Sequence, residues 1–181
     1  IQTVRKVMEE KEFVEVEIPT LQPIYGGANA RPFISHSNAL DQDLYLSISP
    51  ELYLKKLIIG NMEKVYSITK NFRNEDIDKT HNPEFTTMES YAAYWDYNDV
   101  MRLTEEIFQE ACVAVNGDTK FTYQGKEFDL QGKWEQLPMK KAIKKYGDLD
   151  VDALSDQQML DLIAKSGKKM ENPKLRGLII N

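Results

Sequence analysis

The segment from Tyr66 to Tyr94 constrains the fold more than any other part of the sequence. It contains two runs in which polar and apolar residues alternate, and a loop rich in charged residues separates them. Successive side chains of a β-strand point to opposite faces, so each run predicts a strand with one polar and one apolar face. A hairpin made from the two runs, with His81 in its loop, would gather these side chains on one surface: Arg73, Glu75, Phe85, Glu89 and Tyr91.

This predicted surface combines residue types that suit a nucleotide and an amine. A guanidinium offers a planar pair of donors to a phosphate, an aromatic ring stacks on a base, and a carboxylate pairs with an ammonium. The alternative is a solvated hairpin face with an ion pair between Arg73 and Glu75, because most charged residues on strands are merely exposed. The spacing of the residues favours the first interpretation.

The spacing resembles a known motif. Phe72-Arg73-Asn74-Glu75, followed by His81, Phe85 and Glu89, is similar to the second signature motif of the class II aminoacyl-tRNA synthetases. Over essentially the whole chain, "GGANARPF", "ISPELYLKKLIIG", "HNPEFTTMESY" and "WEQLPMKKAIKKYG" resemble the catalytic domain of class II lysyl-tRNA synthetases. The aspartyl and asparaginyl branch typically has "RQPEFTQ" in place of the "HNPEFTT" of this chain.

The resemblance implies an α+β fold, in which an antiparallel sheet is flanked by helices. It implies that residues 1–181 are one partial catalytic domain, that the anticodon-binding domain is absent, and that the chain stops before the family's third motif. ATP is the implied nucleotide substrate. No metal ligand set can be assigned within the chain, and magnesium is expected in the intact parent through residues that are absent here.

The resemblance also implies how ATP is bound. Arg73 would hold the α-phosphate and the amino-acid carboxylate, and it is the predicted catalytic residue because it would stabilise charge developing on that phosphate. Glu75 would hold the adenine amino group, and His81 would reach the β- and γ-phosphates. Phe85 would stack on the adenine, with core packing as its alternative. The implied ATP-binding residues are Arg73, Glu75, His81, Asn82 and Phe85.

A second set of residues is implied for lysine. Glu51 would recognise the α-amino group, although a carboxylate is also favoured there by the dipole of a helix N-terminus. Glu89 would lie near the ε-ammonium with the Tyr91 phenol beside it, and a neutral substrate side chain would leave that acid unpaired. The implied lysine-binding residues are Gly27, Glu51, Arg73, Glu89 and Tyr91.

The remaining segments predict further helices and strands. Helices are expected over 1–12, from the Ser49-Pro50 cap to Gly60, from a cap at Asp96 or Asn98, and over 138–146 and 155–166. Strands are expected in "FVEVEIP", near 33–36 and 44–48, and as a Gly-turn hairpin in "TKFTYQGKEFDL". The apolar stripe expected on the helix after Asp96 comprises Val100, Leu103, Ile107, Ala111 and Ala114. Lysines in 48–60 and 140–145 are expected on solvated helix faces, with tRNA contact as the alternative for the second group.

Composition limits the class of protein. The net charge of −6 and the pI of about 5.1 exclude a generally basic nucleic-acid surface but not a local basic groove. Cys112 is the only cysteine and predicts a buried structural thiol. No apolar run approaches the ~20 residues of a membrane span, and no signal-like start is present, so we expect a soluble cytoplasmic protein.

We expect the intact parent to be a homodimeric ligase that converts lysine and ATP to lysyl-adenylate and charges tRNA(Lys). Ile18-Pro19-Thr20-Leu21 resembles the end of the family's first motif, at the dimer interface. Both ends of the chain look cut, which predicts a fragment that folds, exposes apolar surface near 177–180 and is inactive in adenylation. The alternatives are a lysyltransferase paralogue that modifies a protein, an aspartyl- or asparaginyl-tRNA synthetase relative, and a non-catalytic dimer-forming module.

Overall fold

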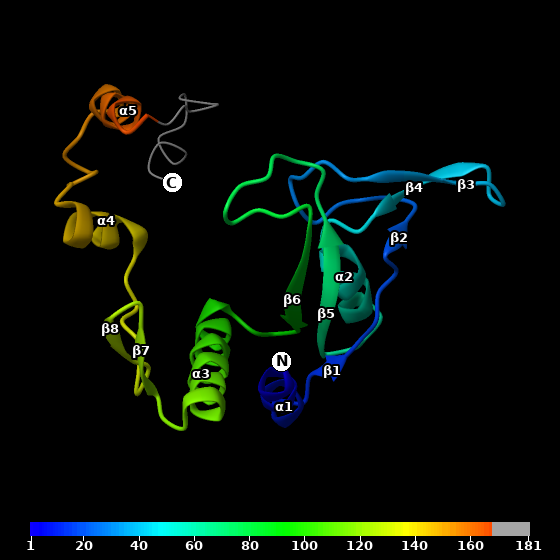
Figure 1. Cartoon of the computed structure of the whole chain (residues 1–181), viewed down its shortest axis with the longest axis horizontal. Helices are drawn as coiled ribbons and strands as arrows, with labels where there is room; N and C mark the ends of the chain where they lie inside the picture. Colours follow the sequence, from blue (N-terminus) through cyan, green and yellow to red (C-terminus); the bar gives the residue numbers. More distant parts are fainter. Residues whose placement is uncertain (168–181) are drawn as a thin grey trace. The chain divides into compact units, whose positions relative to one another are not determined.

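The structure, a computed structural model, describes residues 1–167. The apolar run at 177–180 lies outside these residues. The chain forms two compact units that divide between Gly132 and Lys133, and the first unit contains every predicted site residue. The strands of that unit form three small sheets, and α-helices accompany them, as the α+β prediction requires (Figure 1). No helix within residues 1–167 is both long and apolar enough to cross a bilayer.

The predicted hairpin is the centre of the first unit. Strands β5 (Lys64–Phe72) and β6 (Glu84–Ala92) pair antiparallel, with Ser67 opposite Glu89 and Asn71 opposite Phe85. This register places Ser67, Asn71, Phe85 and Glu89 on one face, and so confirms the predicted faces. Strand β5 ends at Phe72, so Arg73 and Glu75 lie just beyond it. The backbone amide of Arg73 still donates to the carbonyl of Pro83 (2.8 Å).

The strand predicted in residues 13–19 is much shorter than expected. Strand β1 (Val14–Glu15) contains two residues, and it pairs parallel with β5. Its partner along that edge is limited to the backbone around Tyr66, where the amide of Val16 adds one hydrogen bond to the Tyr66 carbonyl (2.9 Å). The alternating sequence therefore yields only two residues of paired strand and one further hydrogen bond at Val16.

The apolar face of the sheet packs against two helices. Helix α1 (Gln2–Glu10) contacts helix α3 (Tyr97–Asn116), and the two lie side by side in Figure 1. Their apolar side chains and those of the hairpin form one core, because the sheet must cover its apolar face. The buried members of this core are Val7, Met8, Phe13, Tyr66 and Leu103.

Helix α2 (Glu51–Ile59) packs against β5 and β6. A network of polar side chains joins the segment before α2 to these two strands. The Oγ of Ser47 donates to the Asn71 amide oxygen (3.2 Å), and the Asn71 Nδ2 donates to the Thr87 hydroxyl (2.5 Å). Ser47 and Asn71 are both buried. Buried polar groups that are fully paired favour one arrangement, so this network fixes the segment before α2 against the strands.

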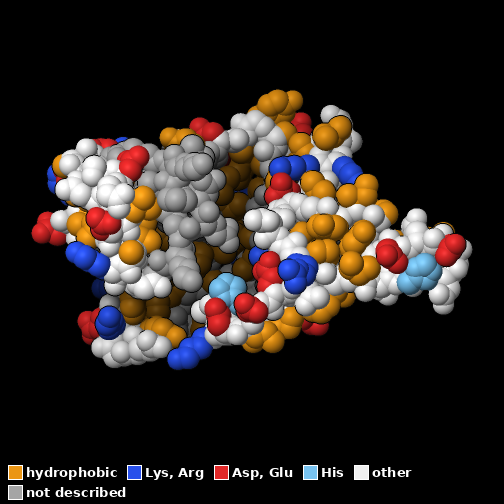
Figure 2. Space-filling model, turned by 90° about the horizontal axis from the view of Figure 1, so that it is seen from above, with side chains coloured by type: hydrophobic (Ala, Val, Ile, Leu, Met, Phe, Trp, Pro, Cys, Tyr) orange, Lys and Arg blue, Asp and Glu red, His pale blue; other side chains and the backbone are white. Residues whose placement is uncertain are grey.

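A second sheet extends from the unit as an arm. It contains β2 (Leu21–Gln22), β4 (Gln42–Leu46) and β3 (Ile34–Ser37) in that order, with antiparallel pairing. The segment after β4 joins this arm to the hairpin, because the Phe72 amide donates to the Ser47 carbonyl (2.8 Å). His36 of β3 lies within ion-pair distance of Asp41 and Asp43. Figure 2 shows acidic side chains beside a histidine at the end of the molecule where the arm projects.

Helix α3 begins as predicted but buries fewer residues than predicted. Asp96 is its N-cap and accepts hydrogen bonds from the amides of Asn98 and Asp99, while Asp99 bonds back to the Asp96 amide. Leu103 and Cys112 are buried, which confirms the buried thiol. Val100 is 52% exposed and Ala114 is exposed, so the expected stripe is wrong at both ends. The apolar core that α3 covers does not extend along the whole length of the helix.

The rest of the chain follows the predicted elements closely. Strands β7 (Lys120–Tyr123) and β8 (Lys126–Asp129) form the hairpin, with Gln124 and Gly125 both at positive φ in its two-residue turn. The second unit contains α4 (Met139–Gly147) and α5 (Asp156–Lys165). Three lysines of α4 pair with acids of the same unit, which favours the solvated-face interpretation over tRNA contact. These pairs are Lys140–Asp152, Lys144–Asp150 and Lys145–Glu135.

Tyr66 should make the first unit lose stability at alkaline pH. Its hydroxyl donates to Glu15 (3.0 Å), which also binds the guanidinium of Arg5 (2.9 Å). Burial first, and then the bond to Glu15, raise the pKa of Tyr66 to about 12. The unfolded chain ionises this phenol near pH ~10. Folding therefore keeps its full Tyr66 contribution below pH ~10 and loses it as the pH rises toward 12.

Denaturant unfolding at several pH values, with Tyr66→Phe as the comparison, measures this effect. We expect the free energy of unfolding of the wild type to fall more steeply than that of Tyr66→Phe between pH ~10 and ~12. Parallel slopes for the two proteins would show that the phenol titrates at its ordinary value.

Candidate active site

All five predicted ATP-binding residues line one pocket at the loop end of the hairpin. The pocket has a volume of about 180 Å³, and Figure 1 shows the loop that forms it between β5 and β6. Two further polar residues of the loop, Asp76 and Thr80, complete the lining. The structure thus brings the sequence-predicted set together, and the roles of its members stay predictions. The set consists of Arg73, Glu75, His81, Asn82 and Phe85.

Among the residues that the structure describes, Arg73 is held by a carbonyl and a ring, and no acid pairs with it. Its Nε and Nη2 atoms both donate to the Ile48 carbonyl (3.3 Å each), and its guanidinium lies 5.0 Å from the centre of the Phe85 ring. In the described part of the chain it forms no ion pair with Glu75, so the solvated-face alternative loses its central contact. A guanidinium without an anionic partner is suited to bind a phosphate or carboxylate.

Glu75 is positioned from the other side by a segment distant in the sequence. The backbone amide of Arg31 donates to the Glu75 carboxylate (3.3 Å), and the amide of Asn74 donates to the Arg31 carbonyl (2.8 Å). These two bonds hold the segment around Arg31 along the start of the loop. No local sequence pattern predicts this contact, because Arg31 and Glu75 are 44 positions apart.

Asp78 organises the rest of the loop around His81. Its Oδ1 accepts hydrogen bonds from the amide and hydroxyl of Thr80 and from the amide of His81, at 2.7–2.9 Å. The Nδ1 of His81 also lies 2.8 Å from the Asp78 carboxylate. The Thr80 amide, followed by the His81 ring, holds the pKa of the Asp78 carboxyl well below its usual range. His81 is therefore fixed at one nitrogen by a charged carboxylate.

A second group of predicted residues meets beside the N-terminus of α2. Ser49 links them, because its hydroxyl donates to Glu89 (2.9 Å) and accepts from the backbone amide of Glu51 (3.1 Å). Tyr91 donates its phenolic hydrogen to the other oxygen of Glu89 (3.3 Å). The N-cap of α2 is Pro50 and not the predicted Ser49. Ser49 instead joins Glu51 to Glu89, a role that sequence reasoning missed.

Gly27 completes the group through its backbone. A Cβ at this position would lie 2.7 Å from the Cβ of Glu51 and 3.0 Å from the Oγ of Ser49. Its φ of +87° also lies in the region that side chains rarely adopt. Only glycine allows the chain to approach α2 this closely. The lysine-binding prediction thus gathers Gly27, Glu51, Glu89 and Tyr91 in one place, while Arg73 lies at the neighbouring pocket.

The second group is strongly acidic. Burial first, and then the negative charges of Glu89 and Glu51, raise the pKa of the Tyr91 phenol above its ordinary value. Glu51 is paired with Lys55 on the next turn of α2 (2.6 Å), whereas the hydrogen bonds to Glu89 come from two hydroxyls. Lys55 is exposed, as the solvated-face prediction expects, and its four-residue spacing from Glu51 on the helix allows this ion pair.

Taken together, the two groups can hold an anion and a cation side by side. The Arg73 guanidinium can bind a phosphate or carboxylate, and Glu89 can bind an ammonium through an oxygen that already faces the Tyr91 phenol. Within residues 1–167, no three His, Cys, Asp or Glu side chains converge as metal ligands. The described residues therefore do not fit a magnesium ion, and we derive no step through one.

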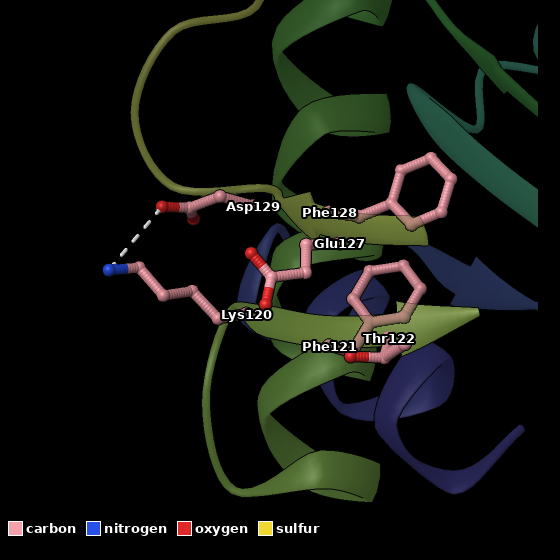
Figure 3. Close-up of a pocket in the computed structure, with 6 residues that line it drawn as sticks. All are labelled: Lys120, Phe121, Thr122, Glu127, Phe128 and Asp129. Carbon is pink, nitrogen blue, oxygen red and sulfur yellow. Dashed lines mark ion pairs between the residues drawn. The ribbon is translucent and has the colours of Figure 1, made fainter. Parts of the chain in front are cut away.

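A larger hollow of about 400 Å³ lies at the β7–β8 hairpin and has a different character (Figure 3). The rings of Phe121 and Phe128 stack there with their centres 5.3 Å apart, and Lys120 pairs with Asp129 (3.9 Å). The hairpin alone lines this hollow, and none of the predicted site residues reaches it. Its shape is that of an open strand surface, so we assign no function to it.

Comparisons with known proteins bear on this geometry. The family described as tRNA synthetases class II (D, K and N) matches residues 1–178. The chain is 52% identical over 159 residues to the lysine–tRNA ligase of Methanoculleus marisnigri, which covers 88% of this chain and 31% of that protein. It is 51% identical over 172 residues to the lysine–tRNA ligase of Chloroflexus aurantiacus, covering 94% and 35%.

A third relative shows the same proportions. The lysine–tRNA ligase of Clostridium novyi is 51% identical over 174 residues, which are 96% of this chain and 34% of that protein. The chain thus spans about a third of the length of the curated relatives it matches.

Proposed function

The chain belongs to the class II tRNA synthetase family (D, K and N), and we propose that it is part of the catalytic domain of a lysine–tRNA ligase. The family match runs through both compact units, which supports treating 1–181 as one partial domain. The relatives named above are lysine–tRNA ligases, and they support the lysine branch over the aspartate and asparagine branches.

The proposed reaction has two steps. A carboxylate oxygen of lysine attacks the α-phosphorus of ATP, and the bond from that phosphorus to the bridging oxygen breaks as pyrophosphate leaves. A hydroxyl at the 3′ end of tRNA(Lys) then attacks the carbonyl carbon of the lysyl-adenylate, and AMP leaves. Arg73 binds the α-phosphate and the lysine carboxylate, so it brings the reacting atoms together and stabilises the negative charge between them.

The remaining pocket residues orient the nucleotide. Phe85 lies against the Arg73 guanidinium, so an adenine that stacks on the other side of the ring is held close to the phosphate-binding fork. Glu75 accepts from the adenine amino group, and His81 donates to the terminal phosphates. Because Nδ1 of His81 donates to the Asp78 carboxylate, Nε2 is the atom left for a phosphate oxygen, and it donates there when the ring carries both protons.

One observation carries the choice of lysine: Glu89 lies between two hydroxyl donors beside a second carboxylate, Glu51. Two carboxylates at one site attract a ligand with two ammonium groups, and lysine has two. Aspartate would bring its side-chain carboxylate toward Glu89 and be repelled. Asparagine would leave Glu89 without a charged partner.

Pyrophosphate exchange tests this proposal in the full-length protein that contains the chain. We expect exchange that depends on lysine, with aspartate and asparagine at least about 10²-fold less effective. The three amino acids are assayed separately at equal concentration. Exchange that responds to aspartate and not to lysine contradicts the lysine assignment, and no response to any of them contradicts the ligase assignment.

Three further features belong to the proposal. We propose a homodimer, with the segment Ile18-Pro19-Thr20-Leu21 as part of its interface; Pro19, Thr20 and Leu21 are exposed. We also propose a cytoplasmic location and a requirement for magnesium, both supported by the class of reaction alone. The inability of residues 1–181 to make adenylate by themselves stays a prediction from the sequence.

A further inference from the structure

Lys55 reaches into the acidic group that the proposed function assigns to lysine. Its Nζ lies 2.6 Å from Oε1 of Glu51 and 5.9 Å from the centre of the Tyr91 ring. Lys55 lies on α2 and Tyr91 on β6, so these contacts span two elements. Two of the four residues predicted to surround the substrate amines are therefore already in contact with an ammonium that belongs to the chain itself.

We propose that Lys55 is a resident cation that occupies the amine position at Glu51 while the site is empty, and that the α-ammonium of lysine displaces it. This inference rests on the proposed function, because it concerns the same site. Substrate binding then exchanges one ammonium for another at Glu51, so the charge of the site changes little between its empty and filled states. Lys55 thereby lowers the affinity for any ligand that must bind Glu51.

The accessibility of the pair fits such an exchange. The side chain of Lys55 is 53% exposed and that of Glu51 is 30% exposed. A half-exposed lysine can turn into solvent at low cost, because exposed ion pairs are weak and its stem is flexible. Glu51 is less mobile, since its backbone amide donates to the Ser49 hydroxyl and its Cβ lies against Gly27.

Lys56 provides a matched control. It follows Lys55 on α2 and carries the same charge, but its Nζ lies 4.6 Å from the centre of the Tyr53 ring. Lys55→Met and Lys56→Met remove the same charge from adjacent positions. A difference between them therefore reports the contact with Glu51 and not the net charge of the protein.

The probe of the mechanism is 6-aminohexanoate, which is lysine without its α-amino group. This ligand keeps the carboxylate and the distal ammonium, but it has nothing to exchange with Lys55 at Glu51. Competition at Glu51 therefore predicts that Lys55→Met strengthens the binding of lysine and leaves the binding of 6-aminohexanoate unchanged. A general effect of charge strengthens both.

Calorimetric titration of the chain measures the affinity for lysine directly. The affinity for 6-aminohexanoate is measured by its displacement of bound lysine. We expect Lys55→Met to bind lysine about two- to fivefold more tightly than the wild type, and Lys56→Met to bind it equally well. Equal lysine affinity for Lys55→Met and wild type, or an equal gain for both ligands, overturns the competition and leaves the lysine site intact. Lysine binding by none of the three proteins refutes the lysine site itself, and the competition with it.

Discussion

Replacing Arg73 with alanine should lower adenylate formation by about 10³- to 10⁵-fold in the full-length protein, because the α-phosphate loses its only guanidinium from this pocket. The change should leave unfolding cooperative. Arg73 contacts the Ile48 carbonyl and the Phe85 ring but does not belong to the apolar core of the first unit. A loss of about 1 kcal/mol of stability is expected from the packing that is removed.

Two variants make this prediction specific. Arg73→Lys keeps the charge but loses the planar fork, so its activity should fall between those of wild type and Arg73→Ala. Lys70→Ala removes an exposed cation of β5 that pairs with Glu84, and its activity should match the wild type. Pyrophosphate exchange and thermal unfolding are measured for all three. If Arg73→Ala lost activity only in proportion to its folded fraction, the residue would be structural.

The hairpin was predictable because strand periodicity leaves few choices. With a period of two, the polar side chains of residues 66–75 and 85–94 can share a face only in the observed register or one shifted by two. The apolar face of the hairpin then packs into the core, in which Tyr66 is one of the buried residues. Strand periodicity does not predict the positions of Arg73 and Glu75, because both residues lie beyond the last residue of β5.

Contacts between distant segments were the part that sequence could not supply. Ser49 looks like a helix cap from its neighbours alone, and its bond to Glu89 exists only because α2 packs on β6. The same is true of the amide of Arg31 at Glu75. Val100 fits the periodicity of a buried stripe, but its exposure follows from where the sheet below α3 ends.

Replacing Glu89 with glutamine should weaken the use of lysine more than any other change at the amine end of the site. Glutamine has nearly the same shape, so it can still accept from Ser49 and lie beside the Tyr91 hydroxyl. It cannot neutralise an ammonium. Removing one member of a buried charge pair costs about 2–5 kcal/mol, which corresponds to a 30- to 5,000-fold loss in kcat/KM for lysine. Most of the loss should appear in KM.

Glu84→Gln is the matched control, because Glu84 lies on the same strand but is exposed and pairs with Lys70. Its kcat/KM for lysine should equal that of the wild type. A second measurement needs no catalysis. Glu89 is one of the charges that raise the pKa of Tyr91, after burial. Glu89→Gln should therefore lower the pKa of that phenol while leaving it above its ordinary value, and absorbance titration against Tyr91→Phe detects the change.

The two measurements separate the possible failures. A lowered Tyr91 pKa with unchanged kinetics shows that Glu89 faces the phenol, as in the structure, but does not bind the substrate. An unchanged Tyr91 pKa with lost activity shows that the carboxylate lies elsewhere in the working enzyme. Both changes together are the expected result, because the same negative charge that opposes ionisation of the phenol attracts the ammonium of lysine.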